Sequence, residues 1–222
     1  ELNHAIDIVR AVREAVGPNV DLLIEGHGRF SAGHAVDVAH KLAEFDPTWF
    51  EEPCPPDSMN TLAEVSRKSP IPIATGERHM TKHEFFELVT QTEVDVIQPD
   101  LMNTGGITEG KKIAAIAEAD HVGYAPHNPQ GPVAGAIYAH VCATVPNFMI
   151  QEMFQTYDVE WVDELLVEPL EVKDGYVTIP DGPGFGIELD HDVVAEHTYT
   201  EEKVHTINLF EKGWEKREVD RR

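Results

Sequence analysis

Short apolar runs recur along the chain, and each is followed within three residues by an ionisable residue. The runs span residues 22–24, 49–50, 71–74, 94–97, 122–125 and 148–150. The ionisable residues after them lie 23 to 27 positions apart and comprise Glu25, Glu51, Glu77, Asp100, His127 and Glu152. Apolar runs of this length are typical of strands covered on both faces of a parallel sheet, so the pattern predicts six such strands.

Between these runs, apolar residues recur every three or four positions, which predicts amphipathic helices. Strands that alternate with helices about every 25 residues predict right-handed βαβ units and a parallel sheet. A doubly wound sheet would normally carry a glycine-rich phosphate loop after a strand, and no G-x-G-x-x-G sequence occurs here. Ionisable residues at every strand end favour the alternative, a TIM-type (β/α) barrel, whose strand ends converge on one centre.

The predicted barrel is incomplete, because six strands are found where a closed barrel of this type has eight. We expect residues 1–155 to form this partial barrel and the two missing strands to precede residue 1. Residues 156–222 form a separate C-terminal segment in this interpretation. Within it, the alternation across residues 170–179 around Asp174-Gly175 predicts a β-hairpin that returns toward the barrel.

The net charge is −23, from 40 acidic and 17 basic residues, and this charge makes negatively charged partners unfavourable. Nucleic acids and anionic membranes would be repelled, so neither is an expected partner. Charge so far from zero is tolerated best where salt screens it, which indicates a halophilic source. No apolar stretch is long enough to span a bilayer. The two cysteines, Cys54 and Cys142, do not suggest a disulfide framework, and a reducing cytoplasmic location fits best.

Three carboxylates, Glu25, Glu51 and Glu77, end consecutive predicted strands at identical spacing. Carboxylates held this close repel one another unless a cation neutralises them. An all-oxygen set of ligands selects Mg²⁺ over Zn²⁺, which would prefer histidine or cysteine. The sequence therefore predicts a magnesium site made by these three residues.

Asp100 and His127 end the next two predicted strands, so the carboxylate can orient the imidazole and raise its basicity. This pair is a candidate general base. His27 lies two positions beyond Glu25 and would approach the same centre from the opposite side. Two histidines across one metal suit removal of a proton by one and donation of a proton by the other. His79, two positions past Glu77, is the next histidine in line.

Several motifs together resemble those of the enolase superfamily, in particular its mandelate-racemase-like branch. They are Phe50-Glu51-Glu52-Pro53, Thr75-Gly76-Glu77-Arg78, Gln98-Pro99-Asp100, Gly105-Gly106-Ile107-Thr108, Ala125-Pro126-His127 and Gln151-Glu152. Within that branch, His27-Gly28-Arg29 resembles the galactonate dehydratase type of sugar-acid dehydratase. The resemblance covers about residues 20–186 and implies that an N-terminal capping domain is absent from this chain.

The resemblance implies Mg²⁺-dependent dehydration of an aldonic acid to a 2-keto-3-deoxy acid through an ene-diolate intermediate. His127, paired with Asp100, would remove the proton alpha to the carboxylate, and His27 would protonate the departing hydroxyl. Glu152 and the metal would stabilise the ene-diolate. The family usually has Asp where this chain has Glu25, which puts the position of the ion or of the substrate in doubt. The family is commonly oligomeric, so a homo-oligomer is expected.

Three other functions remain open from the sequence. A racemase or epimerase of a 2-hydroxy acid would need a second base facing His127, and His27 could serve geometrically. A cycloisomerase of the muconate type is disfavoured because Asp100 stands where that type has a lysine. A non-catalytic binding barrel would have no use for three carboxylates and a His–Asp pair at matching strand ends.

Overall fold

Five short parallel strands pair side by side in sequence order within residues 2–153 and 161–198, which the computed structural model describes. Each pairs with the next along the chain, so the sheet has the simple order β1-β2-β3-β4-β5. The strands are β1 (Leu23–Glu25), β2 (Trp49–Glu51), β3 (Ile73–Thr75), β4 (Val96–Ile97) and β5 (Gly123–Tyr124). The parallel α/β organisation predicted from the alternating pattern is therefore present.

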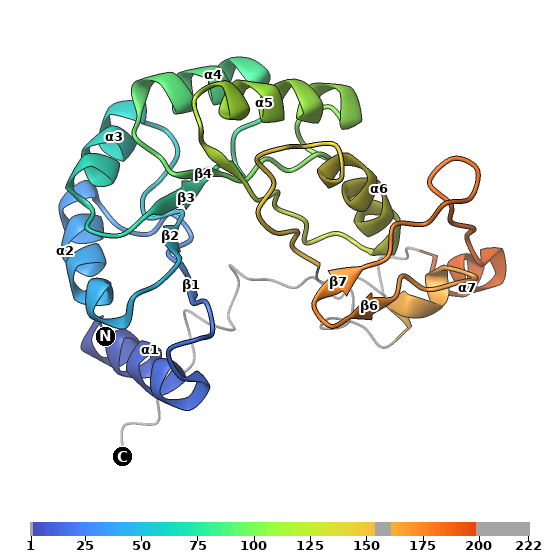
Figure 1. Cartoon of the computed structure of the whole chain (residues 1–222), viewed down its shortest axis with the longest axis horizontal. Helices are drawn as coiled ribbons and strands as arrows, with labels where there is room; N and C mark the ends of the chain where they lie inside the picture. Colours follow the sequence, from blue (N-terminus) through green and yellow to red (C-terminus); the bar gives the residue numbers. More distant parts are fainter. Residues whose placement is uncertain (1, 154–160, 199–222) are drawn as a thin grey trace.

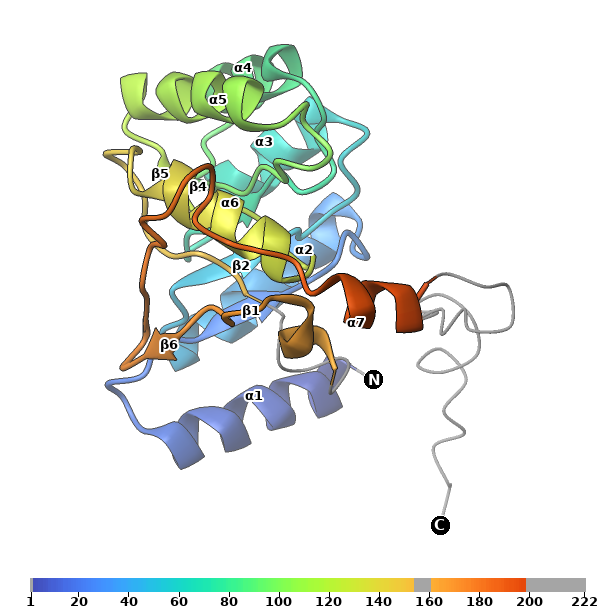
Figure 2. The same cartoon turned by 90° about the vertical axis from the view of Figure 1, so that its right-hand side faces the viewer.

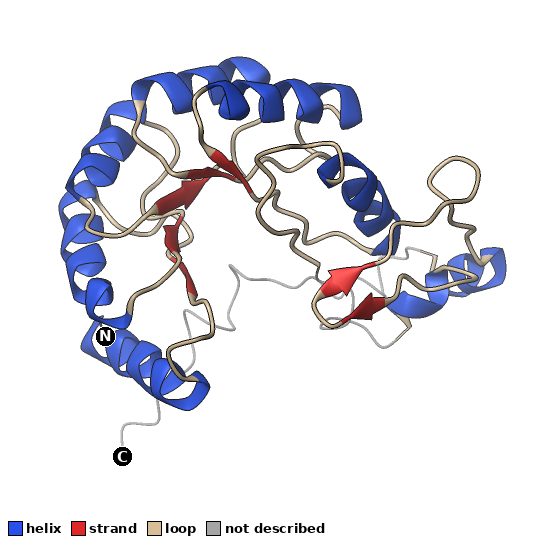
Figure 3. Ribbon diagram, viewed as in Figure 1, coloured by secondary structure: helices blue, strands red, loops and turns tan. Residues whose placement is uncertain are grey.

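Helices connect the strands and lie on the outer side of the curved sheet (Figure 1; Figure 3). They are α1 (Leu2–Val16), α2 (Ala32–Leu42), α3 (Met59–Lys68), α4 (Lys82–Gln91), α5 (Ile107–Ala119) and α6 (Pro132–Cys142), with a short 3₁₀ turn, η1 (Ala43–Phe45), after α2. Side chains fix two of the starts. Ser58 accepts a hydrogen bond from Thr61 N before α3, and Thr81 and Glu84 form a reciprocal capping box at α4. No helix within the described residues has the length and apolarity needed to cross a membrane.

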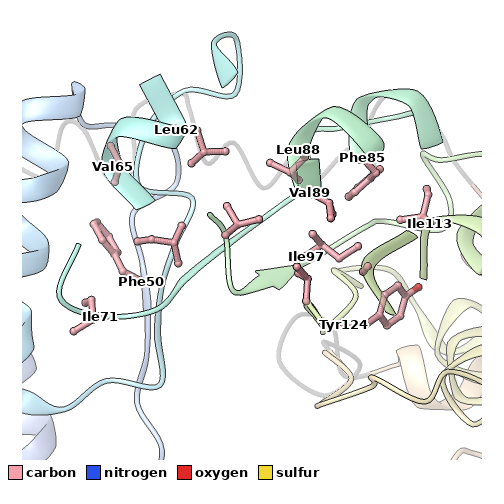
Figure 4. Packing of buried hydrophobic residues seen from close by; sticks show 14 of the residues in the cluster. Phe50, Leu62, Val65, Ile71, Phe85, Leu88, Val89, Ile97, Ile113 and Tyr124 are labelled. Carbon is pink, nitrogen blue, oxygen red and sulfur yellow. The ribbon is translucent and has the colours of Figure 1, made fainter. Parts of the chain in front are cut away.

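The main hydrophobic core lies between the sheet and these helices, as Figure 4 shows. Every second strand residue points into it: Phe50 of β2, Ile73 of β3, Ile97 of β4 and Tyr124 of β5 are all fully buried. Alternate residues of a strand face opposite sides of a sheet. The outward-facing half of each strand thereby anchors the sheet to the helix layer.

The opposite, inward face of the sheet carries a second, smaller apolar cluster. It consists of Trp49, Ala74, Val96 and Ala125, one from each of β2, β3 and β4 and one directly after β5. Glu51 lies two residues beyond Trp49 and so shares this inward face. Alternation along the strands thus places one set of apolar side chains against the helices, and Glu51 at the end of β2 on the inner face of the curved sheet.

The C-terminal described segment contains a 3₁₀ turn η2 (Val162–Leu165), two strands β6 (Val172–Lys173) and β7 (Tyr176–Val177), and a short helix α7 (His191–Glu196). β6 and β7 pair antiparallel around Asp174-Gly175, so the predicted hairpin is confirmed. η2 contacts both α6 and α7, and α7 lies near the end of the described segment (Figure 1; Figure 2). The expected domain boundary at residue 155 falls in residues 154–160, outside the described part of the chain, and stays a prediction.

The structure departs from the predicted strands at both ends of the sheet. Residues 148–150 make only an isolated parallel bridge, between Phe148 and Tyr124, instead of a sixth strand. Phe148, Met149 and Ile150 are 37%, 49% and 51% exposed, and no described residue pairs on their other side. The first strand begins at Leu23, which is 43% exposed, so the expectation that β1 is covered on both faces is wrong for the described residues. An edge strand lacks the neighbour that would cover it.

Candidate active site

Three carboxylates meet at the carboxyl ends of β1, β2 and β3. The register pairs Glu25 directly with Glu51, so their side chains leave the sheet on the same face. Glu77 follows β3 after Gly76, whose φ of 141° is closed to most residues and where a Cβ atom would lie 2.9 Å from Gln98 N. One oxygen from each of the three carboxylates lies within 4.8 Å of the others.

These carboxylates line a cavity of about 490 Å³ on the inner face of the sheet. The predicted site residues His27, His127 and Glu152 also line it. Asp100 does not, because it is fully buried behind His127. Apolar walls are supplied by Leu23, Trp49, Ala125, Pro126, Pro129 and Ile150. Six of the seven residues predicted from sequence are therefore brought to one cavity, and the seventh supports it.

Hydrogen bonds orient two of the carboxylates. The indole Nε1 of Trp49 donates to Oε2 of Glu51 at 2.8 Å, and the backbone N–H of His27 donates to Oε1 of Glu25. The second bond requires a tight turn after β1, in which His27 has a φ of 51° and Gly28 a φ of 66°. Left-handed backbone at a non-glycine residue is uncommon and costs energy, so the surrounding contacts hold the turn in place.

Desolvation and nearby charges disfavour the ionised forms of Glu25 and Glu77 when no cation is near. Glu25 is exposed as a whole residue, but partial desolvation of its carboxylate, and then the negative charge of Glu51, raise its pKa to about 9. Burial likewise raises the pKa of Glu77. A divalent cation between the three groups would reverse this effect, and their all-oxygen chemistry suits a hard ion. The residues present thus fit a metal ion of the magnesium type.

His127 is held by Asp100 at the end of β4. Its Nδ1 lies 3.1 Å from Oδ2 of Asp100, and its Nε2 lies 3.5 Å from Oε2 of Glu77. Burial alone would lower the pKa of His127, but the hydrogen bond to Asp100 and the charge of Glu77 outweigh it and raise this pKa above its ordinary value. The carboxylate of Asp100 accepts a hydrogen bond from Nδ1–H of His127. The other ring nitrogen, Nε2, is therefore directed at the cavity, toward Glu77.

His27 stands on the other side of Glu77. Its Nε2 lies 3.7 Å from Oε1 of Glu77, while His127 approaches the second oxygen, Oε2. Burial, and then the positive charges of Arg78 and Arg29, lower the pKa of His27. One histidine with a raised pKa and one with a lowered pKa therefore flank the same carboxylate. A molecule placed in the cavity would lie between two proton-transfer groups.

Glu152 is fixed by Asn128 in the loop after β5. Oε2 of Glu152 accepts from the backbone N of Asn128 at 2.7 Å, and the side-chain amide of Asn128 donates to the backbone carbonyl of Glu152 at 3.0 Å. Asn128 itself is fully buried. These two bonds hold the segment that carries Glu152 against the rim of the cavity.

Two residues that support Asp100 have no signal in the sequence. Gln130 and Tyr138 both donate to Asp100, although they lie 30 and 38 residues further along the chain. Trp49 was predicted only as a strand residue. Because it lies two positions from Glu51 and on the same face of the strand, the sequence could have identified its indole N–H as a donor to Glu51. For Gln130 and Tyr138 no local pattern identifies the partner.

Two other residues lie away from the cavity. His79 is 3% exposed and its ring centroid lies 5.9 Å from that of Phe85, on the core side of β3. Cys54 is buried and free, and burial raises the pKa of its thiol to about 11. Neither lines the cavity. A buried thiol with a raised pKa is a poor nucleophile.

Comparison with known proteins gives consistent results. A family model described as enolase C-terminal domain-like matches residues 1–193. The D-gluconate/D-galactonate dehydratase of Picrophilus torridus is 38% identical over 213 residues, which cover 96% of this chain and 54% of that protein. The chain therefore spans about half the length of this relative.

Solved structures are similar in the same way. A putative mandelate racemase/muconate lactonizing enzyme from Burkholderia SAR-1 superposes with a TM-score of 0.85 at 41% identity, covering 89% of this chain and 49% of that one. A racemase from Streptomyces coelicolor A3(2) with bound magnesium superposes with a TM-score of 0.80 at 31% identity, covering 88% of this chain and 52% of that one.

Proposed function

The chain belongs to the enolase C-terminal domain-like family, and on that basis we propose that the complete protein is a Mg²⁺-dependent dehydratase of aldonic acids. Membership confirms the family resemblance of the motifs. The observation that carries the proposal is the placement of His27 and His127 against opposite oxygens of Glu77. The dehydratase name of the Picrophilus torridus relative supports this choice of reaction.

In this proposal Glu25, Glu51 and Glu77 hold the magnesium ion, since each offers a carboxylate oxygen to one small volume. When bound, the ion supplies positive charge that offsets the negative charge developing on the substrate carboxylate as the alpha proton leaves. Trp49 holds Glu51 in position, and the His27 turn does the same for Glu25.

His127 is the proposed base. The Nδ1–H group donates to Asp100, which leaves the lone pair of Nε2 directed at the cavity. The proton alpha to the substrate carboxylate passes to Nε2, and Asp100 stabilises the imidazolium that results. Asp100 stays ionised because its hydrogen-bond donors outweigh its burial and lower its pKa.

His27 is the proposed acid. When the bond between the alpha carbon and its hydrogen breaks, its electron pair first delocalises into the substrate carboxylate and gives the ene-diolate. The return of this pair forms a double bond between the alpha carbon and C3 as the carbon–oxygen bond at C3 breaks. The departing hydroxyl takes a proton from Nε2 of His27 and leaves as water. The resulting enol becomes the 2-keto-3-deoxy acid by transfer of one proton. The lowered pKa of His27 makes its protonated form a stronger acid than an ordinary imidazolium.

Glu152 has a proposed supporting role at the wall of the cavity. It would contact the substrate carboxylate and help to stabilise the deprotonated substrate. The bond from Asn128 N fixes one of its oxygens and leaves the other for the ligand.

A racemase or epimerase of a 2-hydroxy acid is the second candidate. One observation favours it: the two histidines approach opposite oxygens of Glu77, at 3.7 and 3.5 Å, so a substrate carbon between them could be reached by a base on either side. The Streptomyces coelicolor relative is described as a racemase. This reaction needs no departing group, and that difference separates the two candidates.

The test uses the full-length protein with Mg²⁺, at low and at high salt, against a panel of aldonic acids in D₂O. Formation of a 2-keto-3-deoxy acid and deuterium exchange at the alpha carbon are measured for the wild type, His27→Asn and His127→Asn. We expect product to be lost in both variants and exchange to survive only in His27→Asn. His83→Asn, which alters an exposed histidine on α4, is the matched control and should retain both activities.

One outcome would contradict the dehydratase and another would contradict the assigned roles. Exchange or epimerisation without any keto acid would replace it by the racemase. Exchange that survives in His127→Asn but not in His27→Asn would reverse the two assigned roles.

A further inference from the structure

The fully buried Glu52 forms an ion pair with the half-buried Arg78, next to the segments that carry the three carboxylates. Glu52 lies directly after β2 with a φ of 41°, is 0% exposed and does not line the cavity. Its carboxylate accepts from Nε of Arg78 at 3.0 Å, and a second guanidinium nitrogen lies 2.8 Å from the same oxygen. The other oxygen accepts from the hydroxyl of Thr75 and from Gly76 N, the latter at 2.9 Å.

This pair contacts the segments that carry all three carboxylates. Glu52 follows Glu51 directly, and its carboxylate binds Gly76 and Arg78, which flank Glu77 on both sides. The backbone carbonyl of Glu52 accepts from Gly28 N at 2.6 Å, in the turn that follows Glu25. One residue therefore links the ends of β1, β2 and β3.

Arg78 also supports the turn that carries His27. The guanidinium group packs against Gly28 so closely that a Cβ atom at this position would overlap it. Gly28 has a φ of 66°, so the turn also needs the left-handed conformation that glycine adopts without strain. The position of His27 thus depends on the place of the Arg78 side chain.

Burial of the Glu52 charge costs free energy, and such an ion pair often adds little net stability compared with apolar side chains. The charge-assisted hydrogen bonds of the pair do constrain the relative position of the two side chains, because the planar guanidinium group of Arg presents its N–H donors in a fixed arrangement. Glu52 makes these bonds to β3 while Glu51, next to it, faces the cavity. The position of the pair therefore affects the positions of Glu51 and Glu77, which are its neighbours in the chain.

We propose that the Glu52–Arg78 pair is a positioning device that sets the separation of Glu25, Glu51 and Glu77 and the placement of His27. In this proposal both residues act through the three carboxylates, and Nε of Arg78 also lies 3.7 Å from Oε1 of Glu77. This inference rests on the proposed function, because it concerns the same metal site. Partners behind metal ligands typically change metal affinity by 10- to 100-fold when they are removed.

The test measures binding of Mn²⁺ to the full-length protein, from the electron paramagnetic resonance signal of the free ion, without substrate. We expect Glu52→Gln and Arg78→Met each to weaken Mn²⁺ binding by about 10- to 100-fold and Arg78→Lys to weaken it less. A simple charge effect predicts something different: removal of a positive charge near the site would tighten binding in Arg78→Met. The sign of the change in Arg78→Met therefore separates positioning from electrostatics.

Arg67→Met is the matched control for charge, because Arg67 forms an exposed pair with Glu93 at 3.5 Å and lies on α3. Its Mn²⁺ affinity should equal that of the wild type. Thermal unfolding of every variant is recorded, and binding is measured well below the lowest melting temperature. Affinity that falls in Arg67→Met as much as in Arg78→Met would overturn the proposal.

A second variant tests the pair without changing any charge. Gly28→Ala pushes against the Arg78 guanidinium group, and we expect at least tenfold weaker Mn²⁺ binding. Gly184→Ala is matched to it, since Gly184 has a φ of 68° but no atom within 4 Å of a Cβ position. It carries the same backbone strain and should leave Mn²⁺ affinity unchanged.

The two proposals fail in distinguishable ways. Absence of Mn²⁺ binding to the wild type would remove the metal site and with it the proposed function. Binding by the wild type, combined with unchanged or tighter binding by Glu52→Gln, Arg78→Met and Gly28→Ala, would overturn only the positioning role.

Discussion

Nδ1 of His127 lies 3.1 Å from Oδ2 of Asp100, and the remaining capacity of Asp100 is taken up by other donors. Oδ1 accepts from the hydroxyl of Tyr138 at 3.0 Å and from Met102 N at 2.8 Å. Oδ2 also accepts from Nε2 of Gln130 at 2.8 Å. Burial alone would raise the pKa of Asp100, but these donors hold it below the ordinary value. The carboxylate is therefore fixed in its charged form and orients the imidazole.

Asp100→Asn should reduce kcat by about 100-fold or more, because an amide can present a donor to Nδ1 and so favour the wrong tautomer of His127. Deuterium exchange at the alpha carbon should fall in parallel, since both depend on the base. Asp57→Asn, at an exposed loop position, is the control. Unchanged exchange in Asp100→Asn would show that His127 does not need this partner.

Tyr138→Phe should lower the free energy of unfolding by about 1–3 kcal/mol. The hydroxyl of Tyr138 accepts from the backbone N of Leu101 at 2.6 Å, and the ring is fully buried, so its removal leaves a buried N–H group without this acceptor. Urea unfolding measures the change. Tyr176→Phe is the control, because Tyr176 is 79% exposed. An equal effect in both variants would contradict the assignment of the loss to this bond.

Trp49→Phe should weaken Mg²⁺ binding by about tenfold while it retains an aromatic wall of the cavity. Phenylalanine lacks the N–H group that orients Glu51 at 2.8 Å. Titration calorimetry on the full-length protein measures the affinity. Trp161→Phe, in the C-terminal segment and outside the cavity, should bind the ion as the wild type does. A Trp49→Phe protein with wild-type affinity would show that Glu51 needs no orienting donor.

Without the metal, the free energy of unfolding should decrease as the pH rises. In the metal-free protein the pKa of Glu25 is raised from 4.5 to about 9, chiefly by burial. Between these values the folded protein keeps a proton that the unfolded chain has released, so the free energy of unfolding decreases with pH. Saturating Mg²⁺ should remove this slope, because the ion favours the ionised carboxylate.

Urea unfolding with EDTA at several pH values measures the slope, and Glu25→Gln should have a smaller slope than the wild type. Glu87→Gln, which alters an exposed residue of α4, should retain the slope of the wild type. A metal-free protein whose stability rises across this window would contradict the crowding of the three carboxylates.

The strand and helix order could be predicted because each element has a local pattern. Trp49-Phe50 and Val94 to Ile97 are short apolar runs between amphipathic segments, and β2 and β4 lie within or beside them. The sixth run, at residues 148–150, has the same local pattern but forms only one bridge, because no described strand pairs on its other side. Pairing depends on neighbours that a local pattern does not contain.

By itself, the sequence determined the alternation of strand and helix and the ionisable residue near the end of each apolar run. Alternation along a strand then assigned Glu51 to the inner face. Only the tertiary structure decided which residues support these groups: Arg78 behind Glu52, and Tyr138 and Gln130 around Asp100. The reason is physical. Periodicity follows from the geometry of a single strand or helix, whereas these contacts join residues 26 to 38 positions apart and exist only once the elements pack.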